Sequence, residues 1–339
     1  MQDPYAYGLH GREHFGVPYD PEKEVRCRFL NENVSGWENE TAPAVEYENM
    51  ILYKLHVRGY TKLARKMVSH KGTFLGLTEM IPYWQELGIN AIELMPAYEF
   101  CEVPINKPKE GSEHIKTRRK ENVVNYWGYA SGFYLSPKSA YCSTREPEQE
   151  FRYLIRELHK NGIRVILDGV FNHCGSFNKW MDWEKIYEKD GGYEPGAYLT
   201  ADSPYRDFFL FGDQDGWPDN DSYEGWWGHN TLPKLNYEGS KKLYQYVLDI
   251  AKRWLSPPYS IDGWRLDVAA DLGHSPEMNH RFWRDFRKTV KEANPDALIL
   301  AEHYGDASDW LSGDQWDTVM NYDAFMEPVS WFLTGLEKH

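Results

Sequence analysis

Short apolar runs that alternate with helix-like segments constrain the fold of this 339-residue chain more than any other feature. Each run is rich in aliphatic residues and has the length of a strand that is buried on both faces. The runs occupy residues 51–57, 90–95, 164–168, 261–267 and 298–302, and the helix-like segments occupy 77–87, 147–160, 243–255 and 279–293. Residues 318–322 and 326–336 continue the pattern as a sixth strand and the start of a sixth helix. The alternation predicts an α/β fold of parallel βαβ units.

Three of the predicted strands end in an acidic residue. Asp168, Asp267 and Glu302 each follow an apolar run directly. Parallel strands present their carboxyl ends at one edge, where a (β/α) TIM-type barrel builds its site. Arg265 precedes Asp267 by two residues, and side chains at that spacing on a strand point the same way. The sequence therefore predicts a TIM-type barrel with an acid cluster at its rim, and paired carboxyl groups are the usual equipment for hydrolysing a glycosidic bond.

Two long insertions interrupt the alternation. Residues 102–136 contain the charged stretch 107–120 and are predicted to form a solvated loop. Residues 174–237 are rich in Gly, Asp and Trp, and a segment of that length is predicted to form a small subdomain over the barrel rim. The predicted domains are an extended lead-in at 1–48, a catalytic barrel at 49–173 and 238–339, and the inserted subdomain at 174–237. We interpret Trp217, Trp226 and Trp227 as packing residues of that subdomain.

The amino-acid composition limits which kinds of molecule this chain is expected to bind. The net charge of −14 argues against a nucleic-acid surface, and no stretch approaches the length that spans a membrane. Four cysteines without metal-binding spacing predict free thiols and a cytoplasmic location. Aromatic residues make up 16% of the chain, which fits either a large core or stacking on sugar rings. Asp and Asn residues at 202–221 could bind a structural calcium ion, but the absence of a regular loop pattern favours a solvated acidic loop.

Several ordered motifs resemble the α-amylase family, glycoside hydrolase family thirteen. The segments 168–173 (DGVFNH) and 263–269 (GWRLDVA), together with Glu302, resemble motifs of its third, fourth and fifth strands. The fourth-strand motif is similar to that of neopullulanases and cyclomaltodextrinases, and 232–236 (LPKLN) resembles a further family motif. By contrast, the segments at 93–96, 125–129 and 3–6 are more similar to pullulanases and isoamylases.

The resemblance implies a role for each candidate site residue. Asp267 would be the nucleophile, Arg265 would keep it ionised and oriented, and Glu302 would be the general acid and base with a raised pKa. Carboxyl groups about 5–5.5 Å apart would imply retention of configuration. His173 and Tyr129 would line the sugar subsite, although Tyr129 could equally be a packing residue, and Asp168 would support the site. The resemblance implies an α-glucan substrate and chemistry that needs no cofactor.

One expected motif is missing. The family carries a His-Asp pair on its seventh strand, and this chain contains no His-Asp dipeptide. About six of the eight barrel strands are predicted, so we expect an incomplete barrel that stops before the seventh strand, without the C-terminal β-domain. Three functions stay open: a retaining hydrolase of α-1,4 bonds in starch, glycogen or maltodextrins, an α-1,6 debranching enzyme, and a catalytically silent binding scaffold.

Overall fold

A computed structural model describes residues 5–17, 26–28, 41–64, 68–103, 124–187 and 194–335. Its strands are β1 (Leu9–His10), β2 (Arg26–Cys27), β3 (Leu52–Leu55), β4 (Ala91–Leu94), β5 (Tyr98–Phe100), β6 (Ser131–Pro137), β7 (Arg164–Gly169), β8 (Gly263–Leu266), β9 (Leu298–Ala301) and β10 (Thr318–Val319). Its α-helices are α1 (Val57–Lys62), α2 (Phe74–Thr78), α3 (Ile81–Glu86), α4 (Pro147–Lys160), α5 (Lys241–Leu255), α6 (Pro276–Ala293) and α7 (Glu327–Thr334). Short 3-10 helices lie at Tyr47–Asn49, Ser139–Tyr141, Arg206–Phe208, Trp226–Gly228 and Ala269–Asp271, and a π-helical turn lies at Tyr322–Met326.

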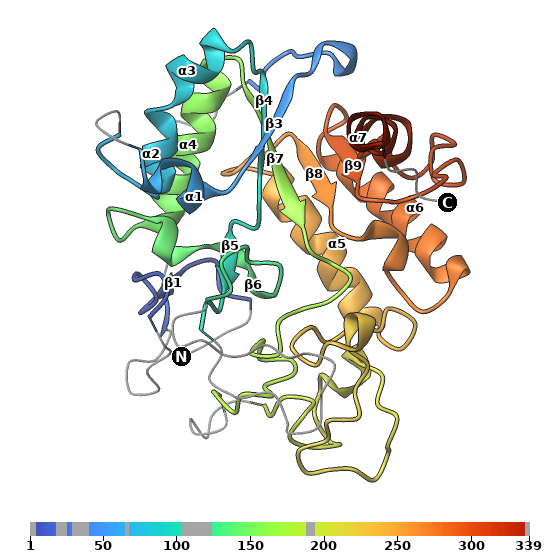
Figure 1. Cartoon of the computed structure of the whole chain (residues 1–339). Coiled ribbons are helices and arrows are strands. Elements are labelled where there is room, and N and C mark those ends of the chain that lie inside the picture. Colours follow the sequence, from blue (N-terminus) through green and yellow to red (C-terminus); the bar gives the residue numbers. More distant parts are fainter. Residues whose placement is uncertain are drawn as a thin grey trace.

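A curled sheet of six parallel strands organises the described residues (Figure 1). The strand order is β10-β9-β8-β7-β4-β3, so four of the five neighbouring pairs are consecutive strands, and β5 and β6 intervene between β4 and β7. Every residue of β4, β7, β8 and β9 is buried, as expected for strands covered on both faces. Helix α4 covers one part of the outer face, and α5 and α6 pack together over another (Figure 1). The predicted α/β fold, an incomplete TIM-type barrel, is confirmed.

The helix boundaries follow from local chemistry. Ser240 and Ser275 are the N-caps of α5 and α6, and each accepts a hydrogen bond from the backbone N–H three residues ahead at 3.2 Å. Such a cap stabilises a helix by about 1 kcal/mol. Helix α4 starts at Pro147 and ends before Gly162, which has φ 73°. These signals place the three long helices close to where the sequence predicts them.

Two predicted elements differ from the structure. The predicted helix 77–87 is divided into α2 and α3, because Pro82 lacks an N–H and cannot lie in a helix interior, although it fits the first turn of α3. Residues 131–136 were predicted as loop, but they form β6, which pairs antiparallel with β5. Both strands are buried throughout and therefore lack the alternating pattern that marks a half-exposed strand.

The segment 194–237 lies beyond the C-terminal end of β7 (Figure 1). It has little regular structure and is joined to the barrel through an isolated bridge between His173 and Lys234. Aromatic packing of Trp180 on Phe208, with ring centroids 5.2 Å apart, holds its interior. The domain boundaries around it stay a prediction. The charged stretch 107–120, parts of the predicted lead-in and part of the 3–6 motif lie outside the described residues.

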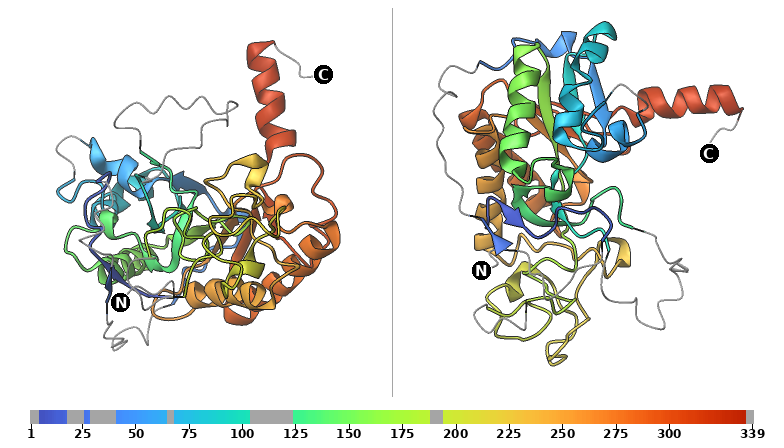
Figure 2. Two further views of the ribbon diagram at one scale, coloured as in Figure 1. Left: turned by 90° about the horizontal axis from the view of Figure 1, so that it is seen from below. Right: turned by 90° about the vertical axis from the view of Figure 1, so that its left-hand side faces the viewer.

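Helix α7 extends away from the sheet (Figure 2). It begins directly after the π-helical turn, so the helix predicted at 326–336 starts one residue later. None of its residues is buried. Among the described residues, no helix combines the length and the apolar content that crossing a membrane requires.

Candidate active site

Arg265 is the centre of a buried charge cluster at the C-terminal end of the sheet. Its Nη1 atom lies 2.8 Å from Asp168 Oδ1 and 2.7 Å from Asp267 Oδ1. Its Nη2 atom lies 2.8 Å from Glu302 Oε2. One guanidinium group therefore contacts three carboxylates at once, through hydrogen bonds to Asp168 and Asp267 and an ion pair with Glu302, a geometry that the planar fork of arginine allows.

Strand register explains why these residues meet. Strands β7, β8 and β9 are parallel neighbours, and Asp168 is paired directly with Arg265. Asp267 and Glu302 each follow the last residue of their strand, and those last residues are also paired. Backbone bonds continue the ladder, with Asp267 N–H donating to Gly169 O at 3.0 Å and Glu302 N–H to Leu266 O at 2.9 Å. The prediction that Asp267 and Glu302 lie on adjacent parallel strands at one rim is confirmed.

A second cation, which the sequence analysis missed, adjoins the cluster. Lys54 on β3 places its Nζ atom 2.8 Å from Glu93 Oε1 on β4 and 3.5 Å from Asp168 Oδ2. The sequence did contain a signal for this pair, because Lys54 and Glu93 are charged residues inside the otherwise apolar runs 51–57 and 90–95. Glu93 is buried, and burial raises its pKa although Lys54 opposes the shift. Two cations, Lys54 and Arg265, thus face four carboxyl groups.

This excess of carboxyl groups affects Asp267. Burial is the largest influence on its pKa, and repulsion from Asp168 and Glu302 acts in the same direction. Arg265 opposes both, but the pKa of Asp267 is raised to about 7. We expected Arg265 to keep this carboxyl ionised. Arg265 lowers the pKa of Asp267, in the direction of that expectation, but it shares its charge among several carboxylates in a poorly hydrated site, so the role stays a prediction.

Tyr129 and His173 form the wall beside the charges. Tyr129 Oη donates to Asp168 Oδ2 at 2.8 Å, and burial raises the pKa of this phenol. Burial lowers the pKa of His173 to about 4, so the ring is neutral near pH 7. Asn172 Nδ2 lies 3.2 Å from His173 Nδ1, which must accept, so the Nε2–H group donates to Tyr129 O at 3.1 Å. This wall can bind sugar hydroxyls without adding charge.

The backbone after the fourth strand holds the carboxyl group of Glu302. Val268 N–H donates to Glu302 Oε2 at 3.0 Å, and Val268 has φ 40°. A β-branched residue is rarely found in this left-handed region. Glu302 Oε1 lies 3.4 Å from Tyr322 Oη, so the two oxygens of this carboxyl group have different surroundings. Oε2 is fixed by Arg265 and Val268, and Oε1 is the less constrained oxygen.

A cavity of about 500 Å³ opens over the cluster. Five of the six predicted site residues line it, namely Tyr129, His173, Arg265, Asp267 and Glu302, and so does Lys54. Asp168 is fully buried beneath them, as expected of a supporting residue.

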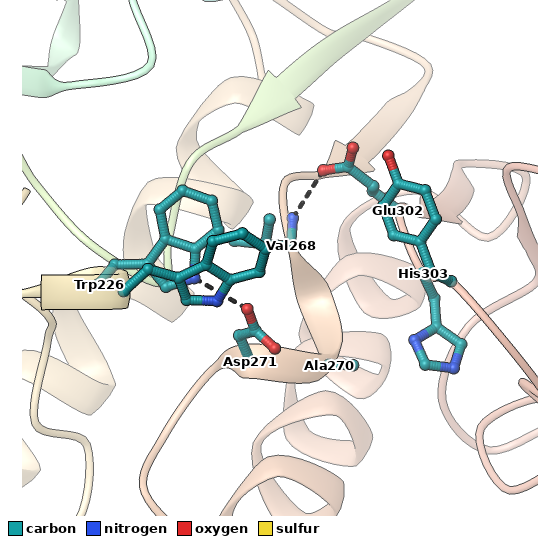
Figure 3. Close-up of a pocket in the computed structure, with 8 residues that line it drawn as sticks. Trp226, Val268, Ala270, Asp271, Glu302 and His303 are labelled. Carbon is teal, nitrogen blue, oxygen red and sulfur yellow. Dashed lines mark hydrogen bonds between the residues drawn. The ribbon is translucent and has the colours of Figure 1, made fainter. Parts of the chain in front are cut away.

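A neighbouring cavity of about 370 Å³ shares Glu302, Val268 and Trp226 with the first (Figure 3). Trp227 also lines this second cavity. The interpretation of Trp227 as a packing residue is wrong, because 80% of its surface is exposed.

Metal binding has no candidate cluster in the part of the chain that the structure describes. No group of three or more His, Cys, Asp or Glu side chains there is placed to hold an ion. Polar side chains of 202–221 bond to one another and to neighbours, such as Ser222 Oγ to Asn220 Oδ1 at 2.7 Å and Lys185 Nζ to Asp219 Oδ2 at 2.6 Å. Calcium binding in this loop stays a prediction.

Comparison with known proteins identifies the family. A family model described as the catalytic domain of alpha amylase matches residues 27–332. The chain belongs to the α-amylase family. Neopullulanase 2 of Thermoactinomyces vulgaris is 33% identical over 269 residues, and a cyclomaltodextrinase of Thermoanaerobacter pseudethanolicus is 35% identical over 276 residues. These alignments cover 78% and 77% of this α-amylase family chain, which spans 37% and 38% of the two relatives.

Solved structures agree with the family assignment. A debranching enzyme of Nostoc punctiforme is 27% identical and superimposes with a TM-score of 0.58. The match covers 84% of this chain and 55% of the Nostoc chain. The α-amylase fold is therefore shared over most of the chain, whereas roughly half of that structure has no counterpart here.

Proposed function

We propose that this chain carries the catalytic residues of a retaining α-glucan hydrolase that cleaves α-1,4-glucosidic bonds in starch, glycogen or maltodextrins. The observation that carries the proposal is the set of ion pairs that one guanidinium, Arg265, makes with Asp168, Asp267 and Glu302 under one cavity. The names of the neopullulanase and cyclomaltodextrinase relatives support the substrate class.

Each carboxyl group has one part in the proposed reaction. Asp267 attacks the anomeric carbon, and its bond to that carbon forms as the glycosidic C–O bond breaks. Glu302 gives its proton to the departing oxygen. Its carboxylate then takes a proton from water, whose oxygen attacks the anomeric carbon and releases Asp267. Oε1 suits this transfer, because Oε2 is held by Arg265 and Val268.

Neutral groups complete the sugar site in this proposal. His173 and Tyr129 would hold the sugar whose bond is cleaved, and both line the cavity with Asp267. Asp168 would act from below by orienting Arg265 and Tyr129 through its two oxygens. The chemistry would need no cofactor, and a structural calcium ion would affect only stability.

An α-1,6 debranching activity is the second candidate. It is favoured by the segments 93–96 and 125–129, which resemble pullulanases and isoamylases, and by the similarity to the Nostoc debranching enzyme. A silent binding scaffold is the third candidate, and the complete Arg265 cluster argues against it.

The proposed partner is a neutral α-glucan, without nucleic acid or membrane. The net charge of −14 supports this choice, because an acidic surface repels phosphate groups. We also propose a cytoplasmic location, which is supported by the free thiols of Cys101, Cys142 and Cys174.

Product analysis tests the function. The full chain is incubated with maltopentaose and with pullulan, and the first product is followed by ¹H NMR. We expect an α-anomer from maltopentaose, and Asp267→Asn and Glu302→Gln variants should abolish its formation. Release of maltotriose from pullulan, in preference to cleavage of maltopentaose, would favour debranching. Binding without release by the folded chain would favour the scaffold.

A further inference from the structure

A second buried charge network lies at β5 and β6, and its members line neither of the two cavities. Lys138, which is fully buried after β6, forms ion pairs with Glu99 and, at 2.6 Å, with Glu102 Oε1. Arg12 of the lead-in completes the network. Its Nη2 atom donates to Glu102 Oε2 at 3.0 Å, and its Nε atom lies 3.6 Å from Glu99 Oε1. Two cations therefore match two carboxylates.

This balance depends on Arg12. Burial acts to raise the pKa of Glu102, but Lys138 and Arg12 outweigh it and lower that pKa. Without Arg12, two buried carboxylates would share the single charge of Lys138. An uncompensated buried charge is strongly unfavourable, so the backbone around Glu102 would have to move or admit water. Arg12 therefore holds the backbone of Glu102 in place.

The backbone of Glu102 in turn holds the segment that carries Tyr129. Asn125 N–H donates to Glu102 O at 2.7 Å, and Asn125 Nδ2 donates to Cys101 O at 3.3 Å. Asn125 Oδ1 then accepts a hydrogen bond from Gly128 N–H at 3.3 Å. One asparagine thus connects the charge network to the residue that precedes Tyr129.

Phe100 makes a second connection to the same residue. Lys138 Nζ donates to Phe100 O at 2.9 Å and lies 4.5 Å from the centroid of its ring. The ring packs against Gly128, where an added Cβ atom would lie 2.6 Å from Phe100 Cε1. Gly128 also has φ 88°, which residues other than glycine rarely adopt. The backbone that enters Tyr129 is therefore in direct contact with a ring that the network fixes.

An aromatic residue of the lead-in also contacts this segment. Phe15, three residues after Arg12, packs edge-to-face on Tyr126 with ring centroids 5.5 Å apart. It packs on Phe100 in the same way at 6.4 Å. The lead-in therefore contacts the segment 125–129 and its support through ring packing as well as through charge.

We propose that Arg12 is a positioning residue for Tyr129 in the reaction of the proposed function, on which this role depends. In the sugar site, Tyr129 Oη lies 2.8 Å from Asp168 Oδ2, and Tyr129 O lies 3.1 Å from His173 Nε2. Arg12 maintains both contacts without touching the substrate, because it fixes Glu102 and the backbone bonded to it. The lead-in thus takes part in shaping the sugar site.

Hydrogen exchange tests this link without using activity. Backbone exchange of residues 125–130 is followed by mass spectrometry in the full chain, in Arg12→Met and in Arg28→Met. Arg28 is the matched control, because it is an arginine of the same lead-in that pairs instead with Glu146, at 3.1 Å, before α4. Exchange in α5 of the same samples reports global unfolding.

We expect exchange of residues 125–130, relative to α5, to be about tenfold faster in Arg12→Met and unchanged in Arg28→Met. Equal exchange in the unmodified chain and Arg12→Met would overturn the proposal. If Arg12→Met does not fold, Arg12→Lys keeps a cation but loses the forked contacts of the guanidinium, and the same comparison is made with it.

A double-mutant cycle tests whether the effect reaches Tyr129. We expect Arg12→Met to lower kcat/KM for maltopentaose about tenfold to hundredfold, because it displaces a group that holds the sugar. In a Tyr129→Phe background, which lacks the hydroxyl, the same substitution should cost less than about threefold. Equal losses in both backgrounds would overturn the positioning role. If the unmodified chain does not turn over maltopentaose, the proposed function fails, and the exchange measurement still decides whether Arg12 holds the Tyr129 segment.

Discussion

Arg265 Nη1 lies 2.7 Å from Asp267 Oδ1, although the pKa of that carboxyl is raised to about 7. The two facts are compatible because Arg265 also bonds Asp168 and Glu302. A cation shared by three carboxylates cannot neutralise all of them, and burial makes the remaining repulsion strong. The site therefore stores unfavourable electrostatic energy whenever Asp267 is ionised.

Replacement of Asp267 should stabilise the fold at neutral and alkaline pH. The folded-state pKa lies above the ordinary aspartate value of 3.8, so the folded protein binds more protons and loses stability as pH rises from about 4 to 7. We expect Asp267→Asn to be more stable than the unmodified chain at pH 8, by about 1–3 kcal/mol. The difference should shrink towards pH 4. Urea unfolding at both pH values measures it, and a difference that grows in acid would refute the pKa assignment.

Lys54 should control the ionisation of Asp267 through the shared cluster. Lys54→Met removes one of two cations that face four carboxyl groups, so the pKa of Asp267 should rise further, by about 0.5–1 pH unit. In the proposed reaction only ionised Asp267 attacks, and the acid limb of kcat/KM should move upward by the same amount. Lys252→Met, an exposed lysine of α5, is the control. An unmoved acid limb would place Lys54 outside the electrostatic cluster.

Lysine should not replace Arg265. An ammonium group cannot reproduce the two nitrogens that contact Asp168, Asp267 and Glu302 together. We expect Arg265→Lys to lower kcat by about 10²–10³ with the fold retained. Arg265→Met should also destabilise the fold by about 3–5 kcal/mol, because it leaves buried carboxylates without a cation. Steady-state kinetics and thermal unfolding separate the two effects, and near-normal kcat in Arg265→Lys would contradict a bidentate role.

His173 should make the fold sensitive to acid. Its folded-state pKa of about 4 lies below the ordinary histidine value of 6.5, so the unfolded chain binds more protons and stability falls as pH decreases from 6.5 to 4. His173→Gln should reduce this acid sensitivity. If the free energy of unfolding changed equally with pH in both proteins between pH 4 and 7, the ring would not be buried in its neutral form. This slope is opposite in sign to that of Asp267 and can be measured in the Asp267→Asn background.

Sequence alone determined the alternating strands and helices and the acidic residues that follow three of the strands. Apolar runs with an acid at the end specified β7, β8 and β9, because a parallel strand that is buried on both faces is mostly apolar and its C-terminal end lies at the rim where a site is built. The order of Asp168, Arg265, Asp267 and Glu302 along those runs then specified which side chains would meet. The helices α4, α5 and α6 were predictable from their caps and periodicity.

Tertiary structure decided what depends on distance and burial. Lys54 and Glu93 joined the cluster only because β3 and β4 lie beside β7 in the sheet, and no local pattern records which strands become neighbours. The pKa of Asp267 follows from the number of carboxyl groups that share Arg265 and from their exclusion from water. Nothing in the sequence around Trp227 distinguishes it from the tryptophans that pack in the core. Its exposure follows from the backbone conformation of the loop that carries it. Local sequence encodes strands and their ends, whereas the balance of charges and the exposure of a ring are properties of the assembled fold.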